Sequence, residues 1–160
     1  MKKSDIMQMG VHQAHITMNK NQGGPFGAVI TDKEGVIIAT ASNTVLKDCD
    51  PTAHAEVNAI RQACKKLNTY DLSNCVLYAT GYPCPMCLSA IIWANIKEVY
   101  FGCTPEDADK IGFRDDMIYD FLDNRTNSDI SSNIVTLKPL EREMCLRLFE
   151  EYHNKNKTIY

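Results

Sequence analysis

Two short stretches of this chain carry side chains whose types and spacing suit metal chemistry. His54 is followed two positions later by Glu56, and further along the chain Cys84 stands three positions before Cys87. One imidazole nitrogen and two thiolate sulfurs form a ligand set of catalytic zinc, which keeps its fourth position for a water molecule. A carboxylate beside such a set is suited to moving protons to and from that water. We therefore predict that His54, Cys84 and Cys87 bind one Zn²⁺ per subunit and that Glu56 is a catalytic residue.

The two cysteines alone would fit other kinds of site. A C-x-x-C pair also occurs in redox dithiols, in structural zinc knuckles and among ordinary core cysteines. A structural zinc site needs four protein ligands, and the motifs cluster only three, although their spacing leaves room for a distant fourth. A thioredoxin-like dithiol would need neither His54 nor Glu56. The complete set therefore favours catalytic zinc over these alternatives.

Length and composition set the general class. A chain of 160 residues is long enough for one domain with a sizeable core. The 20 acidic residues outnumber the 17 basic ones, and this net charge of −3 argues against a nucleic-acid partner. No apolar run approaches 18 residues and the start has no signal-peptide pattern, so we expect no membrane partner. Seven cysteines, an odd number, fit a reducing cytoplasm.

Helical and strand-like patterns alternate along the chain. The expected elements are a helix over residues 5–19, a hairpin of strands over 26–31 and 36–41, a helix over 54–67, a strand over 75–79, a helix over 87–95, a strand over 98–102, helices over 105–111 and 115–122, a strand over 134–137 and a helix over 141–152. Residues 123–132 are polar and predict a loop. This order predicts a single α/β layer with helices on both faces.

The metal-binding motifs fall at the starts of two predicted helices. His54 and Glu56 lie in one first turn, where positions two apart point in separate directions. Glu56 is therefore better placed to reach the water than to be a second ligand. Cys84 and Cys87 lie at the other helix start, where the helix dipole lowers thiol pKa and favours thiolates. We expect these neighbouring helices to hold one ion between them.

The motifs also match a known family. Zinc-dependent nucleobase deaminases carry H-x-E followed by P-C-x-x-C, and this chain resembles the bacterial guanine deaminases of the cytidine/deoxycytidylate deaminase family. The resemblance covers nearly the whole chain and is weakest over residues 123–132. Its segments are GGPFGAVI (23–30), DPTAHAEV (50–57), AIR (59–61), PCPMCL (83–88) and AI (90–91), with Gly112, Phe113, Asp115, residues 118–119 and the final Tyr160.

The resemblance implies more than the residues alone do. It implies a cytidine deaminase-like fold of three α/β/α layers, with a five-stranded mixed sheet flanked by helices. It implies a single domain over residues 1–160 and a homodimer that exchanges a C-terminal segment, from about residue 120 to 160, by domain swap. It also implies hydrolysis of guanine, a small nucleobase, to xanthine and ammonia in purine metabolism.

Substrate contacts follow from the same resemblance. By position, it implies that Phe26, Asn43, Trp93 and Asp115 contact or shape the purine pocket and that Tyr160 closes it. We expect Asp115 to relay a proton or to hold a purine N–H, unless it is an ordinary exposed acid. Aromatic residues in such a chain are more often core residues than stacking platforms. The glycines beside Phe26 favour the pocket, whereas Trp93 fits the core and the pocket equally. Polar loop residues such as Asn43 often have no ligand.

Two positions depart from the resembling family. Arg114 stands where those relatives carry an acid, and Asp116 stands where they carry a small residue. These differences affect the pocket and leave the proposed chemistry unchanged.

Three other functions remain open. A tRNA adenosine deaminase has similar metal motifs but needs a basic patch for its RNA. The sequence distinguishes only weakly between a deaminase of the free nucleobase and a nucleoside deaminase acting on guanosine or cytidine. An inactive zinc-binding module would keep the ligands but would not need Glu56.

Overall fold

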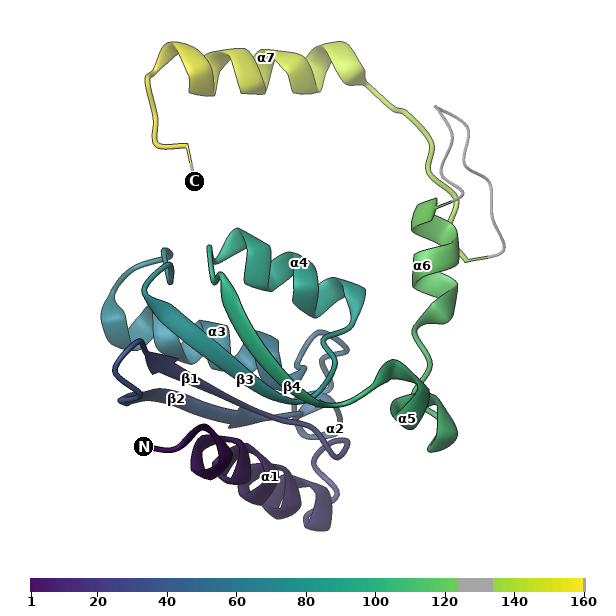
Figure 1. Ribbon diagram of the computed structural model, residues 1–160. Coiled ribbons are helices and arrows are strands. Elements are labelled where there is room, and N and C mark those ends of the chain that lie inside the picture. The colour runs from purple at the N-terminus through teal and green to yellow at the C-terminus, as the bar shows by residue number, and fades with distance from the viewer. Residues whose placement is uncertain (124–133, 160) are drawn as a thin grey trace. The chain divides into compact units, whose positions relative to one another are not determined.

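The computed structural model describes residues 1–123 and 134–159. It divides into two compact units, Met1–Met117 and Ile118–Tyr160, which are described separately (Figure 1). A single domain over residues 1–160 therefore stays a prediction. Among the described helices, none is both long and apolar enough to cross a membrane.

The first unit is built on one mixed sheet. Its strands are β1 (Gly27–Asp32), β2 (Ile37–Ser42), β3 (Cys75–Gly81) and β4 (Glu98–Cys103), in the order β2-β1-β3-β4. β1 is antiparallel to β2 and β3, whereas β3 and β4 are parallel. The β1–β2 turn is closed by the Asp32 carboxylate, which accepts hydrogen bonds from the backbone N–H groups of Glu34 and Val36.

Helices cover both faces of this sheet, as predicted (Figure 1). α1 (Lys3–Asn19) packs Ile6 against Val29 on one face. On the other face, α3 (Ala55–Leu67) and α4 (Pro85–Trp93) enclose a core that contains Ile30 and Leu77. Burial on both faces explains why β1 reads as a continuous apolar run.

α1 approaches the sheet as closely as its backbone allows. A Cβ atom at Gly27 would lie 2.0 Å from the carbonyl oxygen of Gly10, whereas one at Gly10 would meet only side-chain and backbone carbons at 3.5–3.7 Å. Gly27 is therefore the residue that permits this contact.

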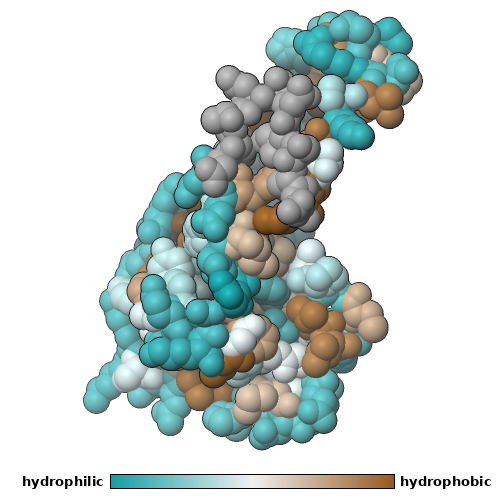
Figure 2. All heavy atoms as spheres, turned by 90° about the vertical axis from the view of Figure 1, so that its right-hand side faces the viewer, coloured by the Kyte–Doolittle hydropathy of each residue, from teal (hydrophilic) through white to brown (hydrophobic). Residues whose placement is uncertain are grey.

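The remaining helices are α2 (Val45–Asp48), α5 (Pro105–Lys110), α6 (Asp116–Asp123) and α7 (Arg142–Asn154). α2 lies between the strand predicted over 36–41 and the helix predicted over 54–67, where no element was expected. The face shown in Figure 2 carries hydrophobic residues among hydrophilic ones.

The fifth strand predicted over residues 134–137 is wrong for the described part of the chain. The sheet there has four strands, and the 134–137 run contains only an isolated bridge residue, Thr136. The run is short, its side chains are exposed, and Pro139 follows closely without an N–H group to extend a ladder. The predicted loop over 123–132 falls almost wholly outside the described residues.

Candidate metal centre and cavity

The three predicted metal ligands meet at the starts of two helices. His54 is the N-cap residue of α3 and Cys84 is the N-cap residue of α4, both with extended backbone. Cys87 follows in the first turn of α4 and is buried. Pro85 at the first helical position suits this start, because its missing N–H group would be unpaired there anyway.

The ligand atoms lie at distances that fit zinc. The Nδ1 atom of His54 is 3.6 Å from the Sγ atom of Cys84 and 3.5 Å from that of Cys87. A tetrahedral zinc ion, with Zn–N of 2.0–2.1 Å and Zn–S of 2.3 Å, holds a nitrogen and a sulfur about 3.6 Å apart. Among the described residues, this metal-binding group has three members, His54, Cys84 and Cys87. The set fits a zinc ion that keeps one position for a non-protein ligand.

Hydrogen bonding determines the charge of the two thiols. Hydrogen bonds with Cys87 and His54 lower the pKa of the Cys84 thiol. Hydrogen bonding with Cys84, together with burial, raises the pKa of the Cys87 thiol, and hydrogen bonding with Cys84 also raises the pKa of His54. These contacts favour the thiolate form of Cys84, which lies beside the imidazole and at a helix start.

Glu56 lies close to the metal ligands but is not one of them. It is only 8% exposed, and one of its carboxylate oxygens lies 3.5 Å from the Sγ atom of Cys87. Burial raises the pKa of the Glu56 carboxyl. A carboxyl group with a raised pKa can both accept and donate a proton near neutral pH.

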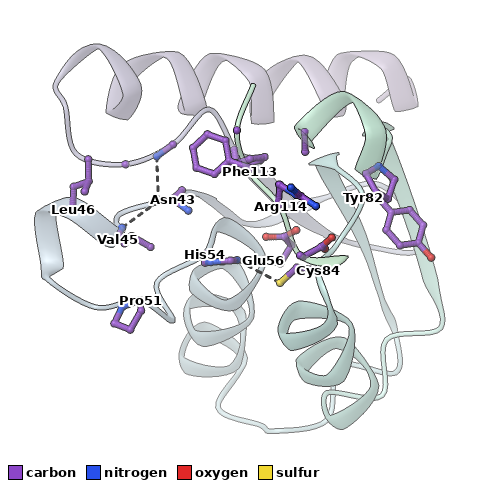
Figure 3. Close-up of a pocket in the computed structure, with 17 residues that line it drawn as sticks. Asn43, Val45, Leu46, Pro51, His54, Glu56, Tyr82, Cys84, Phe113 and Arg114 are labelled. Carbon is purple, nitrogen blue, oxygen red and sulfur yellow. Dashed lines mark hydrogen bonds between the residues drawn. The ribbon is translucent and has the colours of Figure 1, made fainter. Parts of the chain in front are cut away.

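A cavity of about 560 Å³ opens over these groups (Figure 3). Ligand pockets commonly have volumes of about 300–1,000 Å³. The cavity lies within the first unit and is lined by Gly23, Gly24, Phe26, Asn43, Val45, Leu46, Pro51, His54, Glu56, Tyr82, Cys84, Pro105, Ala108, Gly112, Phe113, Arg114 and Asp115. It therefore places apolar walls around a polar floor that contains the metal-binding and proton-carrying groups.

Asn43 presents one defined end of its carboxamide to this cavity. It is 5% exposed, and its Oδ1 atom accepts hydrogen bonds from the backbone N–H groups of Gly24 and Val45, both at 3.2 Å. These bonds leave the NH₂ group as the end available to a ligand. A Cβ atom at Gly23 would lie 2.0 Å from the Asn43 carbonyl oxygen, so this arrangement needs glycine there.

Two other predicted pocket residues also line the cavity. Phe26 contacts Phe113 edge-to-face, with ring centroids 5.0 Å apart at 88°. Partial burial and the nearby Cys84 raise the pKa of the Asp115 carboxyl. Arg114 and Asp116, the two positions that depart from the resembling family, contact each other, and Arg114 lines the cavity.

Trp93 lies away from the cavity in this chain. It is the last residue of α4 and is 72% exposed, whereas Cys84 precedes the first residue of that helix. A helix rises 1.5 Å per residue, so the nine residues of α4 place Trp93 about 13 Å along the axis from the metal centre. Trp93 is not one of the residues that line the cavity of its own chain, and its contact with a purine stays a prediction. Tyr160 lies outside the described residues.

Sequence reasoning did not assign several lining residues to the pocket. Leu46, Pro51, Tyr82 and Phe113 reach it from three separate loops or helix starts. The sequence offered one sign of a pocket residue at Leu46, which is apolar in a mostly polar stretch. The structure shows that this side chain is exposed.

Comparison with known proteins agrees with this geometry. Residues 1–103 match the family model described as cytidine and deoxycytidylate deaminase zinc-binding region. The chain is 53% identical over 106 residues to guanine deaminase of Bacillus subtilis, a match covering 66% of this chain and 67% of that protein. It is 43% identical over 102 residues to tRNA-specific adenosine deaminase of Aquifex aeolicus, covering 64% and 66% of the two chains.

Solved structures extend the likeness to the whole chain. The crystal structure of guanine deaminase from Bacillus subtilis matches with a TM-score of 0.91 at 40% identity, covering 100% of this chain and 99% of that one. Guanine deaminase from Nitrosomonas europaea matches with a TM-score of 0.68 at 25% identity, covering 96% and 85%. With its ligand geometry and the match over residues 1–103, the chain belongs to the zinc-dependent cytidine and deoxycytidylate deaminase family.

Proposed function

We propose that this protein is a zinc-dependent hydrolase that converts guanine and water to xanthine and ammonia. The observation that carries the proposal is the likeness to Bacillus subtilis guanine deaminase over 100% of this chain. By contrast, a solved tRNA adenosine-34 deaminase matches 65% of this chain with a TM-score of 0.62. The cavity, with its buried carboxyl group beside a zinc-fitting ligand set, supports hydrolytic deamination.

His54, Cys84 and Cys87 would hold the zinc ion, which would supply Lewis acidity and lower the pKa of a bound water molecule toward neutral pH. Glu56 takes a proton from the attacking water and donates it to N3 of guanine as the water oxygen bonds to C2. The hydroxyl group now on C2 then gives up its proton, which is carried to the amino nitrogen. The bond between C2 and that nitrogen breaks, ammonia leaves, and the oxygen stays on C2 as the carbonyl of xanthine.

Asn43 explains a preference for guanine over adenine. Guanine presents the acceptors O6 and N7 along one edge, whereas adenine has a donor amine in place of O6. The Asn43 NH₂ group, fixed by two bonds to Oδ1, donates to acceptors and opposes another donor. Phe26 forms an apolar wall of the pocket, and Asp115 holds a purine N–H or relays the second proton.

One assay tests the proposal. Zinc-loaded protein is incubated with guanine, guanosine, adenine, cytosine, cytidine and a tRNA anticodon stem-loop, and ammonia release is measured. We expect release from guanine at least 100-fold faster than from adenine, because the fixed Asn43 donor opposes the adenine amine. Guanosine has the same O6 and N7 edge as guanine, so its rate tests whether the pocket also admits a nucleoside. Faster release from the stem-loop would instead support the adenosine deaminase function, which the 43% identity to the Aquifex aeolicus protein favours.

We also propose that the protein acts as a cytoplasmic homodimer in purine metabolism. In this proposal, the segment from about residue 120 to 160 exchanges between subunits and Tyr160 closes the partner's pocket. The support is the family resemblance.

A further inference from the structure

Arg114 occupies an unusual position on the rim of the cavity. It lies between α5 and α6 and lines the cavity beside Phe113 and Asp115 (Figure 3). Its Nε and Nη2 atoms donate to the two carboxylate oxygens of Asp116 at 3.2 and 2.7 Å. Its Nε atom also lies 3.2 Å from a carboxylate oxygen of Asp109. One guanidinium group thus joins a residue of α5 to the first residue of α6.

The backbone around Arg114 is held on one side by main-chain hydrogen bonds. The N–H of Gly112 donates to the carbonyl of Asp109 at 2.9 Å, and that of Phe113 donates to the carbonyl of Ala108 at 3.0 Å. Gly112 has φ +96°, which favours glycine, and these bonds end α5. Past Phe113, the Arg114 side chain contacts residues of both helices.

The segment carries two side chains that the cavity needs. The Phe113 ring packs on Phe26, and a Cβ atom at Gly24 would lie 3.1 Å from the tip of that ring. Asp115, two residues after Phe113, also lines the cavity. A shift of this segment would therefore move an apolar wall and a carboxyl group together.

We propose that Arg114 is a positioning residue that fixes residues 112–116 so that Phe113 and Asp115 face the substrate. The guanidinium group suits this role because its planar fork binds a carboxylate in one orientation. The effect on catalysis rests on the proposed function, whereas the effect on the segment does not.

Two other roles make different predictions. A purely stabilising role predicts little effect, because ion pairs at a side chain that is 63% exposed contribute about 0–1 kcal/mol. A direct contact with substrate predicts that Asp116 is dispensable, because the guanidinium charge would remain. A positioning role predicts that replacing both Arg114 and Asp116 lowers activity no more than replacing Arg114 alone, because the ion pair between them is already lost.

The test compares Arg114→Met, Asp116→Asn and the double variant with Lys3→Met as a matched control. Lys3 is also 63% exposed and pairs with Glu98 at 3.7 Å, and it does not line the cavity. Turnover of guanine, melting temperature and amide hydrogen exchange of residues 111–117 are measured on the zinc-loaded protein.

We expect Arg114→Met to lower kcat about tenfold, with a smaller change in KM, because a 1 Å misplacement can cost about 100-fold. Asp116→Asn should act in the same direction, and the double variant should match Arg114→Met within about twofold. Exchange of residues 111–117 should rise about tenfold in Arg114→Met and stay at the wild-type rate in Lys3→Met. Melting temperatures should change by less than about 3 °C.

Unchanged exchange in Arg114→Met would overturn the inference, even if the wild-type protein deaminates no guanine. Additive losses in the double variant, or wild-type kcat in Asp116→Asn, would overturn it in favour of a direct substrate contact. Absent turnover in the wild type, with increased exchange in Arg114→Met, would overturn the proposed function and leave the positioning role supported.

Discussion

The carboxyl group of Glu56 combines deep burial with proximity to the metal ligands. In the proposed reaction it is the group that carries protons, and replacing it with an amide removes that ability while keeping its shape. We predict that Glu56→Gln lowers kcat by about 10²–10⁴-fold while one zinc ion per subunit is retained. Ammonia release and metal analysis check both parts. Retained turnover would contradict the role of Glu56.

Burial of Glu56 also predicts a dependence of stability on pH. Because burial raises the pKa of Glu56 in the folded protein above its ordinary value of 4.5, ionisation disfavours the folded state. The wild-type protein should lose stability as pH rises from below 4.5 through the raised pKa, and Glu56→Gln should not show this loss. In chelator-treated protein, the variant should therefore be more stable at pH 8, with the difference shrinking toward pH 4. Urea unfolding at both pH values measures it, and an equal difference at both would refute this cause.

The fixed amide of Asn43 gives a further prediction at this scale. Asn43→Asp keeps an oxygen to accept from Gly24 and Val45 but replaces the NH₂ donor with a second acceptor. We expect kcat/KM for guanine to fall roughly 10- to 100-fold, because a donor is lost against a purine acceptor. The melting temperature should stay near that of the wild type. A large drop in melting temperature would mean that Asn43 acts on the fold instead.

At the scale of elements, the seating of α1 on β1 depends on the absence of a side chain at Gly27. Gly27→Ala would place a methyl group 2.0 Å from the Gly10 carbonyl oxygen, so the helix must move. We predict a loss of about 1–3 kcal/mol in the free energy of unfolding. Gly10→Ala, at the other side of the same contact, meets only ordinary distances and gains helix propensity. Urea unfolding compares the two, and equal losses would contradict this account.

The elements themselves were largely predictable from local patterns. The helices that carry the ligands begin at Ala55 and Pro85, within two residues of the predicted starts at 54 and 87. Their apolar spacing and the proline at the start of α4 are local signals. α2 was missed because four residues give no periodicity. The prediction of a strand over residues 134–137 was wrong because an apolar run does not show whether a partner strand is available to it.

At the scale of the whole molecule, the site joins residues that are distant in the chain. The metal ligands were predictable, because their identity and spacing are chemical and each lies within one short motif. The contacts that build the opposite wall of the cavity could not be predicted from the sequence. Phe113 reaches Phe26 through a tertiary contact that no local pattern encodes. Trp93 shows the converse: its chemistry suited a pocket, yet its place at the end of α4 is far from the ligands.

The last prediction concerns the proposed exchange of the C-terminal segment between subunits. Two variants are combined: Glu56→Gln with an intact C-terminus, and a chain lacking residues 158–160 with Glu56 intact. Each alone should turn over guanine poorly, the first for want of a proton carrier and the second for want of Tyr160. Mixed dimers are made by co-expression and purified through two different tags.

If the C-terminus of one subunit closes the pocket of the other, a mixed dimer has one complete site. It should then show about half the wild-type rate per subunit. If each C-terminus closes its own pocket, no site in the mixed dimer is complete, because one lacks Glu56 and the other lacks Tyr160. The mixed dimer would then be as inactive as its parents. Full activity of the shortened chain alone would show instead that Tyr160 has no part in closing the pocket.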